Sequence, residues 1–440
     1  MKFILLNYRC RMWEDGVVES SHVSEIRQTP GSKEAMKPCR SGAYRRCSPL
    51  EALARVTPFL SSMGITRIAN ITGLDNIGIP VVMVCRPNSR GLSVSQGKGL
   101  DLDEARVSGI MEAAELFHAE NIDLPLVFET YARLRRQVCV AEPNALPGTS
   151  DKRFHPNLRL FWIEGHDLLN DASVWVPNEL VHADFRLPRP RGAGRFLLTT
   201  GGLAAGNEIL EAIIHGICEV IERDSGSLWD LLWPNQRKKT KVRLETVDDP
   251  ACRRVLQMFK NAEVAVAAWN ITSDLGIPAF VAHIIPEFDD TFRRLFTAGG
   301  YGCHASRDIA LLRALLEAAQ SRLTVISGAR DDVLRSEYVR HRRRGMLHSS
   351  RSRILKAKEG IDFQEVPTFD GGTSQQVLDW LLERLRRTGI QQVIAVDLTK
   401  SQFGIPVVRI VIPYLEGDDS STKYSRGPRA NARLAKRRDP

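Results

Sequence analysis

Five polar side chains share one face of a helix that the apolar spacing predicts over residues 207–224. At about 100° per residue they fall within one third of the circumference, opposite an apolar arc. An ordinary exposed face would usually mix both charge signs, but this one contains no lysine. A glycine-rich stretch before the helix, residues 201–206, would present backbone amides to an anion. The five side chains are those of Asn207, Glu211, His215, Glu219 and Glu222.

A second predicted helix, residues 103–120, carries Ser108, Glu112 and Glu115 within about 60° of one another, among small and apolar neighbours. Carboxylates in such a setting need a cation, because burying unpaired charge is costly and like charges repel. If the two helices face each other, two carboxylates from each would surround Mg²⁺, which carboxylates and nucleotide phosphates bind together. These four groups are Glu112, Glu115, Glu219 and Glu222.

A third predicted helix, residues 306–326, also follows a glycine-rich stretch, residues 299–306. That helix carries Glu317, Gln320 and Arg322. The forked guanidinium of an arginine suits a phosphate group, and the alternative for Arg322 is a surface ion pair.

The stretch from Gly91 to Gly99 resembles a P-loop but lacks the required spacing. Five residues separate Gly91 from Gly97, where four are needed, and glycine rather than serine or threonine follows Lys98. We therefore predict no P-loop, while Lys98 remains a candidate phosphate ligand.

The elements that must position these residues are helices and repeated hairpins. Gly-Ile-Pro occurs at residues 78–80, 276–278 and 404–406, each time after a polar turn and before a β-branched run. This pattern predicts one β-hairpin used three times, with proline at the start of the second strand. A capping box at 48–51 begins a further helix, and 374–387 is helical by spacing. We expect an α/β (α+β) fold of several hairpin-based sheets covered by helices.

The net charge of +9 is concentrated in residues 340–358 and in the tail from residue 423 to 438. The first cluster is interpreted as a solvated helix pair. A nucleic-acid interface is the alternative, but the clusters lack the interleaved aromatics of a single-strand groove. Nucleic acid is therefore not expected as a partner.

The eight cysteines contain no CxxC pair, so reduced thiols are expected rather than a zinc site. No apolar run approaches the roughly 18 residues of a membrane helix, and the N-terminal apolar run is too short for a signal peptide. We expect a cytoplasmic protein without a membrane span.

Three ordered motifs resemble the nucleotide motifs of the YcaO family. Ser108-x3-Glu112-x2-Glu115 resembles the first, Asn207-x3-Glu211-x7-Glu219-x2-Glu222-Arg223 the second, and Glu317-x2-Gln320-x-Arg322 the third. The hairpin turns and Gly97-Lys98-Gly99 match as well, so the resemblance runs from about residue 37 to 416. It implies the YcaO fold for a catalytic domain over 48–416. Composition predicts an irregular segment over 1–47 and a basic tail over 417–440 that we expect to be disordered.

The resemblance also implies a reaction. YcaO proteins bind ATP through carboxylates that hold Mg²⁺, and are thought to phosphorylate a backbone amide oxygen of a peptide before a nucleophile attacks the carbon. The magnesium ligands implied here are Glu112, Glu115, Glu219 and Glu222. The implied ATP-binding residues are Lys98, Ser108, Glu112, Asn207, Glu211, Arg223, Gln320 and Arg322. The resemblance identifies no further catalytic residue.

Two departures from the family pattern bear on the product. Leu116 stands where the first motif usually has arginine, and the chain lacks the Pro-rich tail common in azoline-forming members. Together with residues 37–45, this resembles members that make thioamides with a TfuA-type partner. We expect thioamide formation on a ribosomally made peptide or protein, with azoline formation on Cys, Ser or Thr as the alternative. A non-catalytic peptide-binding scaffold is a further alternative. A TfuA-like or E1-like partner and a homodimer are expected.

Overall fold

The structure, a computed structural model, describes residues 47–288, 297–330, 332, 344–356, 360–417 and 423–438. Most of the predicted N-terminal segment and part of the 340–358 cluster lie outside the described residues. No described helix is both long and apolar enough to cross a bilayer.

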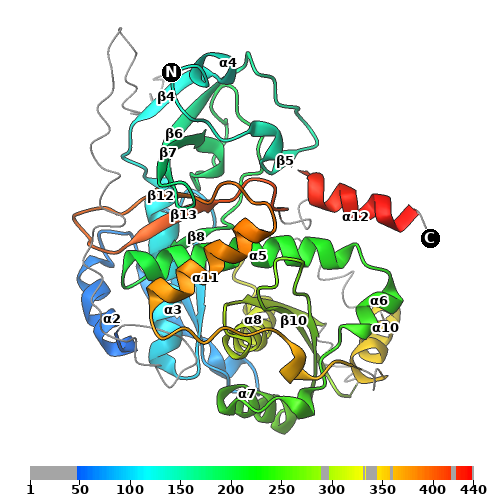
Figure 1. The fold of residues 1–440 in the computed structure, drawn as a ribbon. Helices are drawn as coiled ribbons and strands as arrows, with labels where there is room; N and C mark the ends of the chain where they lie inside the picture. The colour runs from blue at the N-terminus through cyan, green and yellow to red at the C-terminus, as the bar shows by residue number, and fades with distance from the viewer. Residues whose placement is uncertain are drawn as a thin grey trace.

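Three similar units, each a hairpin, a third strand and a helix, build the fold (Figure 1). The first unit contains β1 (Arg67–Asn70), β2 (Val81–Cys85), β3 (Val94–Lys98) and α3 (Leu102–Glu120). The second contains β9 (Val264–Asn270), β10 (Ala279–Pro286), β11 (Ala298–Cys303) and α8 (Arg307–Ser327). The third contains β12 (Ile394–Asp397), β13 (Val407–Val411), β8 (Leu203–Ala205) and α5 (Ile209–Asp230). The mixed helices and antiparallel sheets confirm the predicted fold class.

In the third unit the strand and helix precede the hairpin in the chain. Its sheet has six strands, in the order β4-β6-β12-β13-β8 with β7 beside β6. The added strands are β4 (Leu126–Thr130), β6 (Arg159–Asp167) and β7 (Ala172–Pro177). The remaining helices and strands cover the sheets or join them. They are α2 (Pro49–Val56), α4 (Tyr131–Leu134), β5 (Gly148–Thr149), α6 (Pro234–Lys239), α7 (Pro250–Asn261), α10 (Arg344–Lys356), α11 (Ser374–Arg387), β14 (Tyr424–Ser425) and α12 (Pro428–Arg438).

The three Gly-Ile-Pro segments form the predicted hairpins, with Asn70 opposite Val82 in the first. The turn is built in the same way each time. In the second hairpin, the Thr272 amide donates to the Asn270 side chain at 2.9 Å, and the Thr272 hydroxyl accepts from Ala279 N at 3.1 Å. Thr72 and Thr399 make the equivalent bonds. The glycine of each Gly-Ile-Pro has φ between 59° and 78°, where a side chain would be strained.

Glycine also sets how closely two of the helices lie on their strands. A Cβ on Gly97 of β3 would lie 2.0 Å from the carbonyl oxygen of Ala105 in α3, and one on Gly302 would lie 2.1 Å from that of Ala310 in α8. Any larger side chain would push the helix away. The close approach therefore holds the polar face of each helix at a fixed height above its sheet.

Helix α5 crosses the middle of the molecule and packs on strands of two sheets, β8 and β13 on one side and β10 and β11 on the other (Figure 1). Its apolar side chains Ile213, Ile217 and Ile221 are fully buried. Each contributes roughly 1.5–3 kcal/mol of burial free energy. This burial confirms the predicted amphipathic helix, which extends six residues beyond its predicted end at Asp224.

The prediction of a disordered tail is wrong for residues 423–438. Strand β14 pairs with β5, and α12 follows it. The buried Glu416 accepts hydrogen bonds from Gly427 N and Ala430 N, both at 2.8 Å, and Arg429 donates to the buried Asp224 at 2.9 Å. Composition alone showed a basic, polar run and could not show the two buried carboxylates that hold it.

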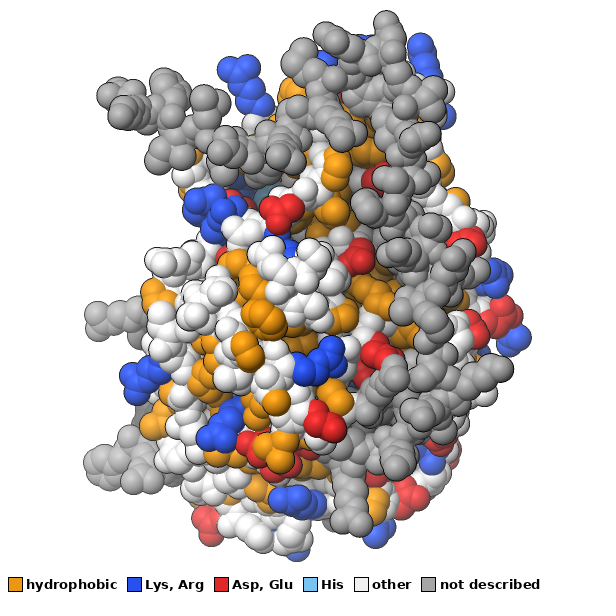
Figure 2. Space-filling view, turned by 90° about the vertical axis from the view of Figure 1, so that its left-hand side faces the viewer, with side chains coloured by type: hydrophobic (Ala, Val, Ile, Leu, Met, Phe, Trp, Pro, Cys, Tyr) orange, Lys and Arg blue, Asp and Glu red, His pale blue; other side chains and the backbone are white. Residues whose placement is uncertain are grey.

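The surface charge is mixed where it can be seen. On the face shown in Figure 2, blue, red and orange side chains of the described residues are interspersed. Part of the basic cluster forms α10, where Arg351 Nε donates to the carbonyl oxygen of Pro286 at 3.2 Å. This part of the cluster therefore packs against the second sheet.

Candidate active site

Carboxylates from α3 and α5 meet around the loop that contains β8. Glu115 Oε1 of α3 accepts a hydrogen bond from Ala205 N at 2.7 Å. Glu219 Oε2 of α5 accepts from Gly202 N at 3.2 Å, and Arg223 Nη2 lies 3.4 Å from Glu219 Oε1. The glycine-rich stretch thus binds the glutamates of both helices, as two facing helices require.

The same loop fixes the start of the second motif. Glu211 Oε2 accepts from both the backbone amide and the side-chain amide of Asn207, each at 2.9 Å. Ser108, one turn before Glu112 on α3, is half-buried. Asn207 is therefore bonded to Glu211, and Ser108 lies on the same helix as Glu112 and Glu115; their contact with a nucleotide stays a prediction.

Helix α8 joins this arrangement through β3. Lys98 Nζ lies 2.6 Å from Glu317 Oε2, and Glu317 Oε1 accepts from Tyr301 N at 3.1 Å. Gln320 Nε2 donates to the carbonyl oxygen of Gln96 at 2.9 Å. The lysine of the rejected P-loop therefore lies at the third motif.

Burial and neighbouring charges shift the pKa values of the glutamates at this site. Burial raises the pKa of Glu112 to about 7, against the opposing effects of Lys98 and Arg330. Burial, with Glu112 and Glu219 adding to it, raises the pKa of Glu115 well above its usual range.

Glu222 and Glu317 respond in opposite directions. Burial, then the charges of Glu317 and Glu219, raises the pKa of Glu222 to about 7. Burial also acts on Glu317, but the neighbouring Lys98 and Arg223 hold the pKa of its carboxyl below the usual range. The charges of neighbouring glutamates therefore add to the effect of burial at Glu112, Glu115 and Glu222.

This donor set suits Mg²⁺. Hard cations prefer carboxylate oxygens, and a cation would offset the burial and the repulsion that raise the pKa values of Glu112, Glu115 and Glu222. Across the described ranges, no three His, Cys, Asp or Glu side chains already form a metal-ligand set. At a nucleotide, phosphate oxygens usually complete the coordination of Mg²⁺.

Arg322 is placed differently from a free phosphate ligand. Its Nε lies 2.7 Å from Asp75 Oδ2, and the two side chains are only 6% and 4% exposed. This buried pair joins α8 to the turn of the first hairpin. The pair is buried, so it is not the surface ion pair considered as the alternative, and the guanidinium is already bound to a carboxylate. Phosphate binding by Arg322 stays a prediction.

Several residues near the site were not predicted. Arg313 of α8 lies 2.7 Å from His215 Nε2 of α5, and Arg409 of β13 is buried beside Glu219. The motif containing Glu317 was recognised, but its pairing with Lys98 was not. Spacing along one helix could not reveal any of these contacts, because each joins two different elements.

Carboxylates of α3 and α5 thus bind one loop, and a carboxylate of α8 pairs with Lys98. A family model described as YcaO cyclodehydratase, binding ATP and Mg²⁺, matches residues 96–416. The chain belongs to the YcaO family, and its cofactors are ATP and Mg²⁺. It is therefore an ATP-dependent enzyme of the cyclodehydratase type.

Two relatives match over most of their length. An uncharacterized protein from the tfuA 3′ region of Rhizobium leguminosarum bv. trifolii is 35% identical over 395 residues, covering 88% of this chain and 92% of that protein. An uncharacterized protein of Methanothermobacter thermautotrophicus is 36% identical over 379 residues, covering 84% and 94%.

Solved structures share the fold. A heterocyclase in complex with substrate and cofactor superposes with a TM-score of 0.70 at 21% identity, over 87% of this chain. The present chain spans 55% of that protein's length. YcaO from Methanopyrus kandleri, bound with AMPPCP and Mg²⁺, gives a TM-score of 0.65 at 22% identity and covers 86% and 93%.

Proposed function

We propose that this chain activates a backbone amide of a ribosomally made peptide or protein, and that the product is a thioamide. ATP with Mg²⁺ would supply the phosphoryl group that turns the amide oxygen into a leaving group, releasing ADP. External sulfide would then attack the carbon, and the oxygen would leave as phosphate. The observation that carries the proposal is the convergence of Glu112, Glu115 and Glu222 with the Lys98–Glu317 pair. These residues form a site for Mg²⁺ and anionic oxygens at one point of three helices.

The residues have distinct parts in the proposal. Glu112, Glu115, Glu219 and Glu222 hold Mg²⁺ on the phosphates. Lys98 Nζ lies 2.6 Å from Glu317 Oε2 and provides positive charge for phosphate oxygens. Ser108, Asn207, Glu211, Arg223, Gln320 and Arg322 are the further proposed ATP-site residues.

One observation favours a thioamide over an azoline. The relative from the tfuA 3′ region covers nearly the whole chain, which supports a TfuA-like partner and thioamide chemistry. A homodimer is proposed on the family resemblance alone.

Charge-neutral variants test the catalytic half. Glu222→Gln and Glu219→Gln should each lower Mg-ATP turnover at least a hundredfold, because each removes a carboxylate that holds Mg²⁺. Thermal unfolding checks that both variants remain folded. Glu383→Gln, at an exposed position on α11, is the matched control and should keep full turnover. Normal turnover in both site variants would refute the proposal.

Mass spectrometry of the modified peptide tests the product. Exchange of oxygen for sulfur identifies a thioamide, and loss of water identifies an azoline. Calorimetry with Mg-ATP tests the scaffold alternative, because a non-catalytic scaffold should bind no nucleotide. Leu116 of α3 packs against the hydrophobic core. It stands where the first family motif usually has arginine, and this departure motivates the scaffold alternative.

A further inference from the structure

A cavity of about 110 Å³ lies next to the second motif. This half-open cavity is lined by β13, α5, the irregular segment around residues 197–201 and the chain at 415–417. One water molecule needs roughly 10–15 Å³ of such space, so the cavity can hold a branched aliphatic side chain. Its apolar walls include Leu180, Leu197, Val220, Ile412 and Leu415.

Arg409 supplies the polar end of this cavity. Its side chain is 2% exposed, and Nη2 donates to the carbonyl oxygen of Thr199 at 2.8 Å. Nε and Nη1 have no acceptor among the described residues. Both nitrogens have almost no accessible surface. Buried donors without an acceptor are costly, so a ligand oxygen that reached them would be stabilised.

The cavity adjoins the residues proposed to hold Mg-ATP. Val220 and Arg223 line it, and they belong to the same turn of α5 as Glu219 and Glu222. Glu219 contacts Arg223 and faces Arg409. A group bound in the cavity would therefore lie beside the carboxylates of the second motif.

The local charge favours a neutral oxygen as the ligand atom. Arg223 is paired with Glu219, and the charge of Glu219 also acts on Arg409. Glu416, which also lines the cavity, already accepts hydrogen bonds from the backbone amides of residues 427 and 430. The walls are mostly apolar, so a carbonyl oxygen on an aliphatic body fits better than a small anion.

We propose that this cavity binds an aliphatic residue of the peptide substrate next to the activated amide, with the carbonyl oxygen of that residue accepting from Arg409. This specificity site rests on the proposed function. It implies that the enzyme prefers a branched aliphatic residue beside the modified bond.

Capped amino acids test the cavity directly. Saturation-transfer NMR on the full chain, with Mg-AMPPCP present, would compare N-acetyl-leucine methylamide with N-acetyl-glycine methylamide. The leucine probe should bind, and the glycine probe should bind at least tenfold more weakly. Absence of leucine binding, or its displacement by inorganic phosphate or acetate, would overturn the proposal.

Variants assign the binding to the cavity. Leu197→Trp and the exposed Thr200→Trp fill it, and Arg409→Met removes the donors. Each should weaken the leucine probe at least tenfold and leave Mg-AMPPCP binding intact, which also reports folding. Leu124→Trp, at an exposed position outside the cavity, is the control.

Unchanged probe binding in Thr200→Trp would refute the assignment. If wild type bound the probe but not Mg-ATP, the proposed function would fail while the cavity site stood.

Discussion

At the scale of single residues, the site is built from carboxyl groups that repel one another. The pKa values of Glu112 and Glu222 are raised to about 7, mainly by burial. A cation that needs both carboxylates ionised must therefore displace protons. The protonation of these glutamates thus links Mg²⁺ binding to pH.

The contribution of Glu112 and Glu222 to stability without ligand should fall with increasing pH. Between the usual carboxyl pKa near 4.3 and pH 7, the folded state binds more protons at these two groups than the unfolded state, so their part of the free energy of unfolding decreases as pH rises through this window. Mg-AMPPCP binding should strengthen over the same window. Thermal unfolding and calorimetry between pH 5 and about pH 8 would measure both. A pH-independent affinity would contradict this account.

The buried pair of Arg322 and Asp75 gives a second expectation. Arg322→Met leaves the carboxylate of Asp75 buried without its partner and should lower the free energy of unfolding by about 3–5 kcal/mol. Adding Asp75→Asn should recover much of that loss, because the uncompensated charge is gone. Denaturant unfolding of both variants measures this. If instead Arg322→Met left stability intact and abolished nucleotide binding, Arg322 would act as a phosphate ligand and not as a tether.

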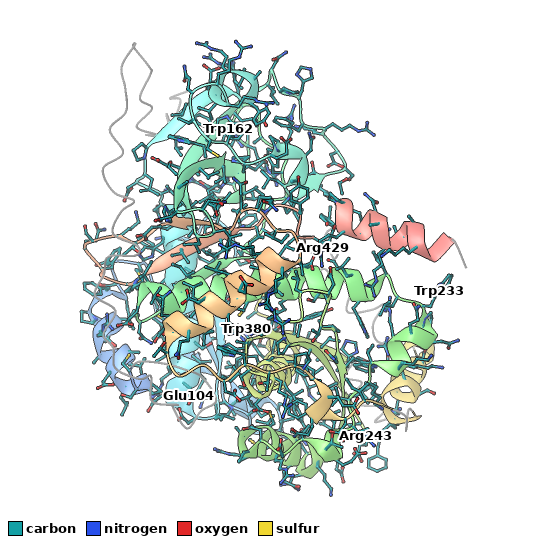
Figure 3. The ribbon with its side chains drawn as sticks, in the orientation of Figure 1. Glu104, Trp162, Trp233, Arg243, Trp380 and Arg429 are labelled. Carbon is teal, nitrogen blue, oxygen red and sulfur yellow. The ribbon has the colours of Figure 1, made fainter. Side chains whose placement is uncertain are left out.

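At the scale of elements, the C-terminal helix is fixed to the active-site helix. Arg429, at the start of α12, lies against the middle of α5 and bridges Asp224 to Asp274 (Figure 3). Asp224 follows directly after Glu222 and Arg223, and it is completely buried. The tail therefore supports the turn of α5 that carries the second motif.

Removing this bridge should loosen two elements together. In Arg429→Met we expect faster amide exchange in residues 428–438 and at the adjoining part of α5, because Asp224 loses its charge partner. Hydrogen–deuterium exchange measures both regions. Arg426→Met, at a neighbouring exposed position, serves as control. Faster exchange confined to α12 would show that the tail does not support α5.

At the scale of the whole molecule, one ligand site depends on three sheets. Helices α3, α5 and α8 each belong to a different unit, so a nucleotide bound between them would hold the units together. A ligand that binds only the folded state at 100 times its dissociation constant adds about 2.7 kcal/mol of stability.

Mg-AMPPCP should therefore raise the temperature of global unfolding in a single transition. AMPPCP without Mg²⁺ should have a much smaller effect, because the carboxylates repel the triphosphate. Scanning calorimetry with each ligand provides the test. Stabilisation of only part of the molecule, seen as two separated transitions, would contradict a site shared by all three units.

Local patterns in the sequence were enough for the units and their motifs. The capping box at Ser48, the limits of α11 and the three Gly-Ile-Pro hairpins depend on neighbours within a few residues, so spacing and turn chemistry predict them. The carboxylate faces of α3 and α5 follow from helical periodicity in the same way.

Only the tertiary structure decided which of these groups meet. The contacts of Lys98 with Glu317, Arg322 with Asp75 and Arg429 with Asp224 join residues more than 200 positions apart. The burial of Arg409, like the order of the tail, depends on side chains from several elements packing around one group. Local sequence determines helix faces and turns, but such long-range pairing and desolvation arise only when the three units pack together.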